Sequence, residues 1–324
     1  MKQFFSVKDI NSISAIVNEA LALKRNPFSH EDLGKHKTLG LVFLNPSLRT
    51  RMSTQKAALQ LGMQVMMMNL NQDGWALETQ DGVVMNGTNV EHIREAAAVM
   101  GVYCDVLGLR SFPNLQNQEQ DYSETLFNKF QQYNKKPLIS LESATLHPLQ
   151  SLADIITIVE HLKPGVKPKV VLSWAPHIKP LPQAVANSFS QWMCKAQEEG
   201  LIDFIITHPE GYQLKDTFIA GTTVTNNQTE ALVDADFVYV KNWSSYHEYG
   251  QILPVEENWM LDQQKWQLTN QAKVMHCLPV RRDLELASEL LDGKDSLVIE
   301  QAENRIWAAQ VVLKQILETL NTAV

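Results

Sequence analysis

Hydroxyl and guanidinium side chains are concentrated at residues 47–51, which read Ser-Leu-Arg-Thr-Arg between an apolar run and a segment of helical composition. A helix N-terminus presents unpaired N–H groups and the positive end of the helix dipole, and therefore binds anions. Ser47 and Thr50 add hydroxyl donors, while Arg49 and Arg51 can form charge-assisted, bidentate hydrogen bonds to phosphate oxygens. The alternative is a capped helix with two solvated arginines, and the spacing alone does not separate the two.

Three other segments place basic or amide side chains directly after an apolar run. Arg110 follows one such run, His147 and Gln150 follow a second, and the pair Arg281-Arg282 follows a third. Taken singly, each could be a helix cap, a packed core residue or a solvated loop charge. Ligands of open α/β sheets bind beyond the carboxyl ends of the strands. Together, the four segments predict a site for a doubly negative small molecule.

Strand-like and helix-like segments alternate along the whole chain. We expect strands over 38–44, 65–70, 102–109, 138–142, 169–174, 203–207, 237–241, 272–276 and 296–299. We expect helices over 13–21, 51–61, 183–196 and 303–320. This alternation predicts an α/β protein in which parallel sheets are flanked by helices.

Length and composition narrow the class of protein. A chain of 324 residues is long enough for two domains, and its net charge of −8 argues against binding to a nucleic-acid backbone. No apolar run approaches the roughly 20 residues of a membrane span, and charge interrupts the N-terminus before any signal-length stretch. The three cysteines, Cys104, Cys194 and Cys277, are too far apart for a disulfide framework or a zinc cluster. We therefore expect a reduced, cytoplasmic protein without membrane partners.

Three motifs resemble those of the aspartate/ornithine carbamoyltransferases. Residues 47–51 match their Ser-x-Arg-Thr-Arg signature for carbamoyl phosphate, residues 147–150 match His-Pro-x-Gln, and residues 276–279 match the His-Cys-Leu-Pro of the ornithine branch. Their order and separation also fit, and the resemblance covers essentially the whole chain. Three matches in register outweigh the alternative of coincidental helix caps.

The resemblance implies two α/β domains, each with a central parallel sheet flanked by helices. It assigns residues 1–150 to a carbamoyl-phosphate domain, which the C-terminal helix 303–324 completes, and residues 151–302 to an acyl-ornithine domain. It also implies a homotrimer in which Trp75 and the loop around Val90 are donated to the neighbouring subunit's site. The alternative for Trp75 is a core tryptophan.

The implied reaction is attack by a neutral amine on the carbamoyl carbon, followed by loss of phosphate from a tetrahedral intermediate. It needs no metal and no cofactor, because carbamoyl phosphate is already activated. The family's catalytic positions correspond to Arg49, His147, Cys277 and Arg281, with Cys277 positioning the substrate rather than attacking it. The implied carbamoyl-phosphate contacts are Ser47, Leu48, Arg49, Thr50, Trp75, Arg110, His147, Gln150, Cys277, Leu278 and Arg305. The implied acyl-ornithine contacts are Val90, Glu142, His177, Lys241, Cys277, Leu278 and Arg281; an ordinary helix-surface arginine is the alternative for Arg305.

The second half differs from ornithine carbamoyltransferases in the segments that, in those enzymes, bind the free α-amino group and carboxylate of ornithine. Residues 174–177 read Trp-Ala-Pro-His and lead into a Pro-rich loop, and residues 241–243 read Lys-Asn-Trp where an acidic residue is expected. An aspartate there favours a cationic α-ammonium, whereas Lys241 repels it and attracts a carboxylate. The pattern resembles the N-acylornithine carbamoyltransferases, whose second domain contains a trefoil knot, an exception to the usual unknotted chain.

The acyl group depends on two further positions. Acetylornithine enzymes carry a glutamate in the loop around residues 89–91 and a lysine shortly after the Arg-Arg pair, where this chain has Val90 and Glu285. We therefore expect transfer to N-succinyl-L-ornithine, giving N-succinyl-L-citrulline and phosphate in arginine biosynthesis. Glu91 opposes this, since a one-residue shift of the loop would put its charge in the pocket.

Two alternatives stay open. One is an N-acetyl-L-ornithine carbamoyltransferase, and the other is a non-catalytic homologue that only binds carbamoyl phosphate. A dinucleotide-binding domain is disfavoured, because no Gly-x-Gly-x-x-Gly follows the first predicted strand.

Overall fold

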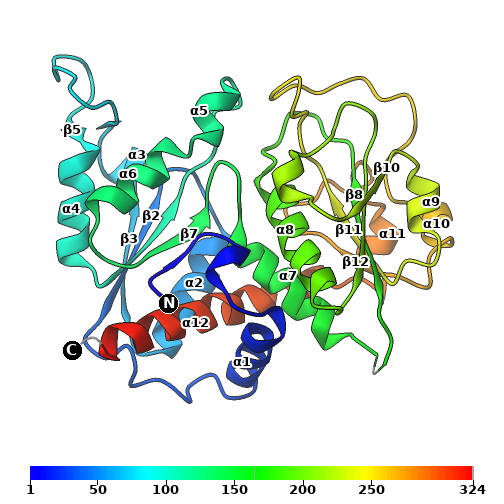
Figure 1. Cartoon of the computed structure of the whole chain (residues 1–324), viewed down its shortest axis with the longest axis horizontal. Coiled ribbons are helices and arrows are strands. Elements are labelled where there is room, and N and C mark those ends of the chain that lie inside the picture. The colour runs from blue at the N-terminus through cyan, green and yellow to red at the C-terminus, as the bar shows by residue number, and fades with distance from the viewer. Residues whose placement is uncertain (164, 323–324) are drawn as a thin grey trace. The chain divides into compact units, whose positions relative to one another are not determined.

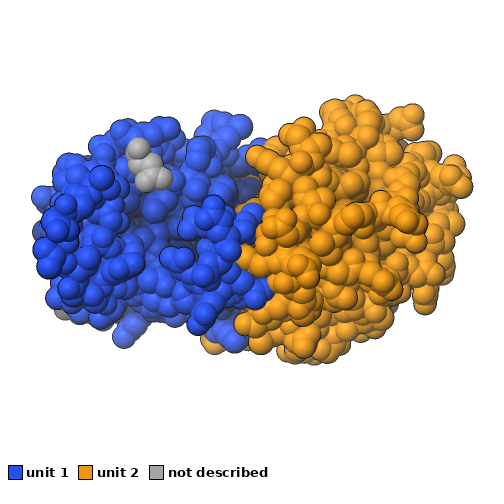
Figure 2. Space-filling view, turned by 90° about the horizontal axis from the view of Figure 1, so that it is seen from above, with its two compact units in different colours: residues 1–9, 18–149, 305–324 blue, residues 10–17, 150–304 orange. Residues whose placement is uncertain are grey.

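The computed structural model describes residues 1–163 and 165–322. The chain divides into two compact units, coloured blue and orange in Figure 2. Unit 1 contains Met1–Asp9, Asn18–Leu149 and the segment from Arg305 onward, and unit 2 contains Ile10–Val17 and Gln150–Asn304. Each unit has its own five-stranded parallel sheet flanked by helices (Figure 1), as the sequence predicts.

The sheet of unit 1 has the strand order β1-β7-β6-β2-β3. Its strands are β1 (Gln3–Phe4), β2 (Thr38–Phe43), β3 (Gln64–Asn69), β6 (Val106–Arg110) and β7 (Leu138–Glu142). The three central strands β2, β6 and β7 are almost entirely buried, because parallel strands covered on both faces contain continuous apolar runs. All neighbouring pairs are parallel, so the carboxyl ends of β2, β6 and β7 lie together at one edge.

Helices flank this sheet. The helices are α1 (Ile13–Arg25), α2 (Arg49–Gln60), α3 (Leu70–Asp73), α4 (Ile93–Tyr103), α5 (Gln118–Tyr122), α6 (Thr125–Tyr133) and α12 (Val298–Thr322), with the 3₁₀ turn η1 (Val7–Asp9). Two of them, α1 and α12, have their first residues in unit 2. Two short strands, β4 (Leu77–Glu78) and β5 (Glu91–His92), pair with each other and form a separate two-stranded sheet.

The sheet of unit 2 has the strand order β10-β9-β8-β11-β12. Its strands are β8 (Lys169–Trp174), β9 (Asp203–Thr207), β10 (Thr223–Thr225), β11 (Phe237–Lys241) and β12 (Lys273–Met275). The other elements are α7 (Pro148–Glu160), α8 (Ala184–Glu198), α9 (Gln228–Leu232), α10 (Gln263–Trp266), α11 (Ser288–Leu291) and the 3₁₀ turn η2 (Asp216–Phe218). Here β8, β11 and β12 are adjacent and parallel, so their carboxyl ends also share one edge.

Two predicted strands are wrong in part. The run predicted over 102–109 begins in α4, where Val102 is 79% exposed, and the strand starts only at Val106. Of the strand predicted over 296–299, Ser296 forms a single bridge to Val274, and α12 begins at Val298. Short apolar runs do not distinguish a helix end from a strand.

The helices formed by residues 1–163 and 165–322 include none that is both long and apolar enough to cross a membrane.

Candidate active site

The carboxyl edge of the unit 1 sheet gathers most of the polar residues singled out in the first half. Helix α2 begins at Arg49 shortly after β2, Arg110 and Glu142 are the last residues of β6 and β7, and His147 immediately precedes α7. A register shift in the β6–β7 pairing sets Arg110 opposite Glu142. Near this edge lies a cavity of about 270 Å³, lined by residues that follow β2, β6 and β7 and by the acidic side chains of Asp121 and Glu124.

The hydroxyl group of Thr50 connects two arginines. It accepts hydrogen bonds from Arg110 Nη1, at 3.1 Å, and from Arg305 Nη2 on α12. Thr50 is 1% exposed and Arg305 is 5% exposed, so the interpretation of Arg305 as an ordinary surface arginine is wrong. The C-terminal helix instead supplies a guanidinium to the same cluster as β6 and α2.

Glu142 is the carboxylate of this cluster. Its Oε2 lies 3.1 Å from Arg110 Nη2 and 3.5 Å from His147 Nε2. Burial lowers the pKa of Arg110, the charge of Glu142 opposes that shift, and the charge of Arg49 adds to it. Arg49, Arg110 and Arg305 outnumber Glu142, the carboxylate that contacts Arg110 and His147, so this cluster carries an excess of positive charge suited to an anion.

His147 is a neutral imidazole in this cluster. It is buried, and burial together with the charges of Arg305, Arg110 and Arg49 holds its pKa well below 6.5. A neutral imidazole donates one N–H hydrogen bond without adding a proton-transfer step. Among the residues that the structure describes, none forms a hydrogen bond with its Nδ1.

Protonation of His147 should make the folded protein less stable in acid. Its folded pKa lies below the unfolded value of about 6.5, so the unfolded chain binds the extra proton first as the pH falls. The stability linked to His147 is therefore complete above about pH 6.5 and is lost as the pH approaches the folded pKa. We expect the denaturant midpoint of His147→Gln to fall less than that of the wild type between about pH 7 and about pH 5. Parallel pH profiles for the two proteins would contradict this assignment.

The first turn of α2 is not capped by a side chain. Leu48 occupies the N-cap position and is 67% exposed, and no side-chain oxygen of the described residues accepts from the first N–H groups of the helix. The alternative of a Ser- or Thr-capped helix is therefore wrong, whereas Ser47 and Arg49 remain partly exposed beside this turn. Arg51 faces away, because its guanidinium contacts Met67 and Asn69 of β3.

The segment around β4 and β5 holds Trp75 and Val90 at the surface. Trp75 is 51% exposed and Val90 is 65% exposed, so the interpretation of Trp75 as a core residue is wrong. The indole N–H of Trp75 donates to Glu91 Oε2 at 2.8 Å, and the backbone N–H of Val90 donates to the Ala76 carbonyl at 3.1 Å. The Glu91 carboxylate is thus engaged within the segment, next to an exposed Val90.

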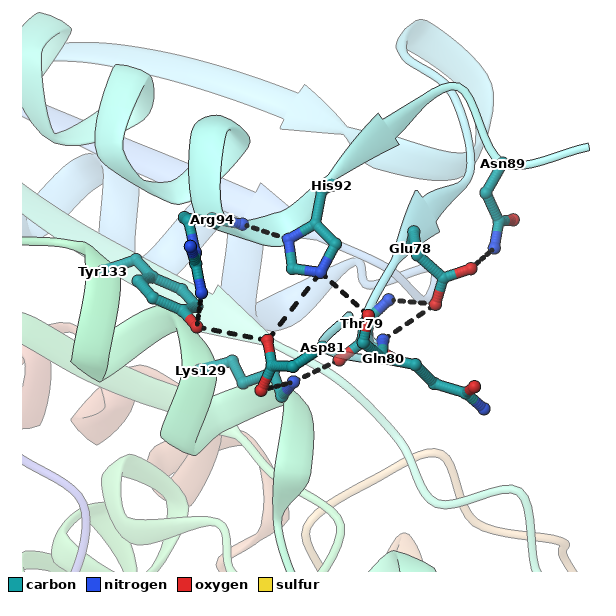
Figure 3. Close-up of polar contacts among 9 residues, drawn as sticks. All are labelled: Glu78, Thr79, Gln80, Asp81, Asn89, His92, Arg94, Lys129 and Tyr133. Carbon is teal, nitrogen blue, oxygen red and sulfur yellow. Dashed lines mark hydrogen bonds and ion pairs between the residues drawn. The ribbon is translucent and has the colours of Figure 1, made fainter. Parts of the chain in front are cut away.

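Polar contacts fix the base of this segment (Figure 3). Lys129 binds both the Thr79 carbonyl and Asp81, at 2.9 Å from the Asp81 carboxylate. Glu78 Oε1 accepts from the backbone N–H groups of the next two residues, and its Oε2 accepts from Asn89 at 2.8 Å. These contacts tie the two ends of the 79–90 loop to each other and to helix α6.

The carboxyl edge of the unit 2 sheet gathers a second set of residues. His177 follows β8, Lys241 ends β11, and Arg281 follows β12. Arg281 Nε donates to His177 Nε2 at 3.1 Å, and His177 Nδ1 donates to the Lys179 carbonyl at 2.8 Å. Burial lowers the pKa of His177, and the charges of Lys241 and Arg281 add to that shift. His177 is therefore a neutral acceptor for Arg281.

Glu285 is the carboxylate of this second set, and its role was not predicted from the sequence. It is 1% exposed; its Oε2 accepts from the backbone N–H of Arg281 at 2.7 Å, and its Oε1 lies 3.6 Å from His276 Nε2. Burial raises the pKa of Glu285, but His276, Lys241 and the Arg281 N–H together lower it by more. The net pKa is below the usual 4.5, so the group is ionised. Lys241 is also buried, and its Nζ donates to the Asn242 carbonyl at 2.8 Å.

The predicted residues Gln150, Cys277 and Leu278 also belong to unit 2. Gln150 Nε2 donates to Asp154 Oδ1 at 2.7 Å. The turn after β12 is held by two bonds, from Leu278 N to His276 Nδ1 at 2.9 Å and from His276 N to Gln301 Oε1 at 3.0 Å. Leu278 has a φ of 55°, a left-handed conformation that is uncommon for a leucine. Across the described residues, no group of three His, Cys, Asp or Glu side chains is arranged to hold a metal ion.

Comparison with known proteins agrees with this arrangement. Residues 2–160 match the carbamoyl-phosphate-binding domain of aspartate/ornithine carbamoyltransferases, and residues 190–316 match their Asp/Orn-binding domain. The N-succinylornithine carbamoyltransferase of Bacteroides fragilis (strain 638R) is 48% identical over 322 residues, which is 99% of this chain and 100% of the relative. The N-acetylornithine carbamoyltransferase of Xanthomonas campestris pv. campestris is 31% identical over 97% of each chain.

Solved structures of N-acetylornithine transcarbamylase have the same fold. A complex with acetylcitrulline has a TM-score of 0.87 and 31% identity, over 98% of this chain and 99% of that one. A mutant with one glutamate replaced by serine, complexed with carbamyl phosphate and N-succinyl-L-norvaline, has a TM-score of 0.89 at the same identity, over 98% and 100%. The chain is therefore a carbamoyltransferase of the aspartate/ornithine carbamoyltransferase family, in its N-acylornithine branch.

Proposed function

We propose that this enzyme transfers the carbamoyl group of carbamoyl phosphate to the side-chain amine of N-succinyl-L-ornithine. The new bond joins the amine nitrogen to the carbamoyl carbon, and the C–O bond to phosphate breaks as the tetrahedral intermediate collapses. The amine loses one proton, for which the departing phosphate is a suitable acceptor. The products are N-succinyl-L-citrulline and inorganic phosphate.

Each group of residues has a distinct part in this proposal. Ser47, Thr50 and the guanidinium groups of Arg49 and Arg110 hold the phosphate, and the neutral His147 donates a hydrogen bond to the carbamoyl oxygen as negative charge develops there. Such donors act most strongly when they are fixed in place before the reaction, and the buried Thr50 cluster supports that condition.

The acceptor amine and the carbamoyl NH₂ group are assigned to residues of unit 2. Gln150 and the backbone carbonyls of Cys277 and Leu278 accept hydrogen bonds from the carbamoyl NH₂ group. Lys241, His177 and Arg281 bind the acyl-ornithine, whose acylated nitrogen carries no positive charge for the buried Lys241 to repel.

The observation that carries the choice of acyl group is the environment of position 90. Val90 is exposed and apolar, and the neighbouring Glu91 carboxylate accepts from the Trp75 indole rather than pointing outward with Val90. The succinyl tail ends in a carboxylate, which a glutamate at position 90 would repel. The 48% identity to an N-succinylornithine carbamoyltransferase supports the same choice.

Steady-state kinetics with both acceptors test this proposal. We expect kcat/KM for N-succinyl-L-ornithine to exceed that for N-acetyl-L-ornithine, and we expect Val90→Glu to lower the succinyl value by about tenfold through like-charge repulsion. Val90→Gln matches the size of the glutamate without its charge and should change the ratio far less. A wild-type preference for N-acetyl-L-ornithine would overturn the acyl assignment. Phosphate release with neither acceptor would favour the non-catalytic alternative.

We also propose that the chain works as a homotrimer in which Trp75 and the Val90 loop enter the neighbouring subunit's site. The edge strand β3 and helix α2 expose Met66 (54%), Met52 (66%) and Leu59 (56%), an unusual number of large apolar side chains for a surface. An exposed edge strand with apolar side chains is a site for association with another chain. The exposure of Trp75 supports the same assembly, because a half-exposed indole ring is available to contact another subunit.

Mixed trimers test the donation directly. Trp75→Ala and Arg49→Ala subunits should each be nearly inactive alone. If Trp75 acts in the neighbouring site, random mixing in equal amounts should restore about one quarter of wild-type activity, because a complete site needs an intact residue from each of two subunits. Mixtures that stay as inactive as the two parents would show that Trp75 acts within its own subunit.

The trefoil knot of the second domain is part of the same proposal. The Pro-rich loop is bound to the segment after β11: Ser244 N donates to the Leu181 carbonyl at 3.0 Å, and Gln183 Nε2 donates to the Ser244 carbonyl at 2.9 Å. A knotted chain pulled from both ends should extend less than its full contour length in single-molecule unfolding. Extension to the full length would exclude the knot.

A further inference from the structure

Asp154 is a fully buried carboxylate to which the proposed reaction assigns no role. It is 0% exposed and lies on α7 one helical turn after Gln150. Its Oδ1 accepts two hydrogen bonds from amide groups, from Gln150 Nε2 at 2.7 Å and from Gln301 Nε2 at 2.6 Å. A buried carboxyl group is costly unless hydrogen bonds compensate it, and the two amide donors supply that compensation.

The carboxylate determines which way both amides point. Its Oδ1 accepts from Nε2 of both glutamines, so each glutamine turns its NH₂ group toward Asp154 and its carbonyl oxygen away from it. For Gln150, this orientation presents Oε1 on the side opposite to Asp154. That oxygen is the acceptor that the proposed mechanism needs for the carbamoyl NH₂ group.

The second amide extends the effect to the turn after β12. Gln301 Oε1, turned away from Asp154, accepts from the backbone N–H of His276 at 3.0 Å. His276 Nδ1 in turn accepts from the Leu278 N–H at 2.9 Å, which fixes the turn that bears the carbonyls of Cys277 and Leu278. Asp154 and Cys277 also both raise the pKa of the buried Tyr239, after the larger effect of burial itself, as expected if they lie close to one phenol.

We infer that Asp154 is a positioning residue for recognition of the carbamoyl NH₂ group, because it orients the Gln150 amide directly and the Cys277–Leu278 carbonyls through Gln301 and His276. This inference rests on the proposed function, since it concerns the same carbamoyl phosphate. In this role, Asp154 helps the enzyme to distinguish the carbamoyl NH₂ group from a methyl group, although Asp154 does not touch the substrate. Discrimination of this kind is strong when the polar groups of a site are held in place and would otherwise be left unpaired.

Acetyl phosphate is the probe that separates this role from a general structural one. It keeps the phosphate and the carbonyl of carbamoyl phosphate and replaces the NH₂ group by a methyl group. Calorimetric dissociation constants for both ligands define a preference ratio for the NH₂ group. In Asp154→Ala we expect this ratio to fall about tenfold while the affinity for acetyl phosphate changes less than about threefold, because one hydrogen-bonded arrangement is lost. Asp154→Asn keeps an accepting oxygen and should retain most of the preference.

Thr157→Val is the matched control. Asn304 Nδ2 donates to Thr157 Oγ1 at 2.9 Å, which links the same two helices one turn further along, away from Gln150 and His276. This variant should lose stability without changing the preference ratio. If Asp154→Ala does not fold, Gln301→Leu is the alternative variant, because it removes only the hydrogen bonds of Gln301 with Asp154 and His276. It should lower the preference ratio about threefold, since Gln150 keeps its hydrogen bond to Asp154.

The outcomes distinguish this inference from the proposed function. A wild-type enzyme that does not prefer carbamoyl phosphate over acetyl phosphate would contradict the proposed recognition of the NH₂ group as a whole. A wild-type preference that Asp154→Ala and Gln301→Leu both retain would overturn only the role of Asp154. An equal loss of affinity for the two ligands would assign Asp154 a structural role alone.

Discussion

Arg49→Ala should lower kcat by on the order of a thousandfold, the loss typical of removing a fixed donor from developing negative charge. Arg49 begins helix α2, where the uncapped first turn and a positively charged cluster of Arg110 and Arg305 lie on the same sheet edge. Its own charge is close enough to help lower the pKa of His147. Removing it weakens the interaction with both the leaving phosphate and the carbamoyl oxygen, which are more negative in the transition state than in the bound substrate.

Arg51→Ala is the control for this effect. Arg51 lies two residues later on the same helix, but its Nε contacts Met67 Sδ at 2.8 Å and its Nη1 donates to Asn69 at 3.2 Å. Losing these contacts should lower the thermal midpoint while kcat stays within about threefold of the wild type. Single-turnover and steady-state rates of phosphate release would measure both variants. A kcat for Arg49→Ala within tenfold of wild type would remove Arg49 from the chemical step.

Most strands covered on both faces of the sheet were predictable, except the start of β6, where the apolar run continues from the end of α4. The predicted boundaries of β7, β8, β9 and β11 coincide with the observed ones, because each strand contains a short run of mostly buried apolar residues. Short elements such as β1, β4, β5 and β10 were not predicted. Their two or three residues carry no periodic pattern, and their pairing depends on distant partners in the chain.

The site residues that directly follow or end parallel strands were predictable, because the carboxyl ends of such strands meet at one edge of the sheet. Arg110, Glu142 and His147 meet because β6 and β7 are parallel neighbours, which the order of elements already indicates. The burial of Arg305 was not predictable, because it depends on where the C-terminal helix packs rather than on local sequence. Asp154 could have been found from its i+4 spacing after Gln150 on a helix. Glu285 could not, since its partners come from β11 and from the turn after β12.

Lys241→Ala should weaken binding of the acyl-ornithine acceptor by about a hundredfold while leaving carbamoyl phosphate binding almost unchanged, because a buried charged group makes strong hydrogen bonds to a carboxylate. Lys241 ends β11 and belongs to the same cluster as His177, Arg281 and Glu285. In the proposed role, its positive charge attracts the carboxylate of the acceptor and repels a free α-ammonium. Removing that charge should therefore also reduce the difference in kcat/KM between N-succinyl-L-ornithine and ornithine.

Lys273 provides the control within the same sheet. It begins β12, at the opposite end of the strand from the turn that carries Cys277, and its Nζ binds Asp295 at 2.8 Å. Lys241→Met and Lys273→Met each remove one positive charge and keep most of the unbranched side chain, so a general effect of net charge should appear in both. Only Lys241→Met should raise KM for the acceptor and lower the kcat/KM ratio of N-succinyl-L-ornithine to ornithine. Should that ratio stay constant in Lys241→Met, the rejection of free ornithine must come from steric exclusion of its ammonium group rather than from the charge of Lys241.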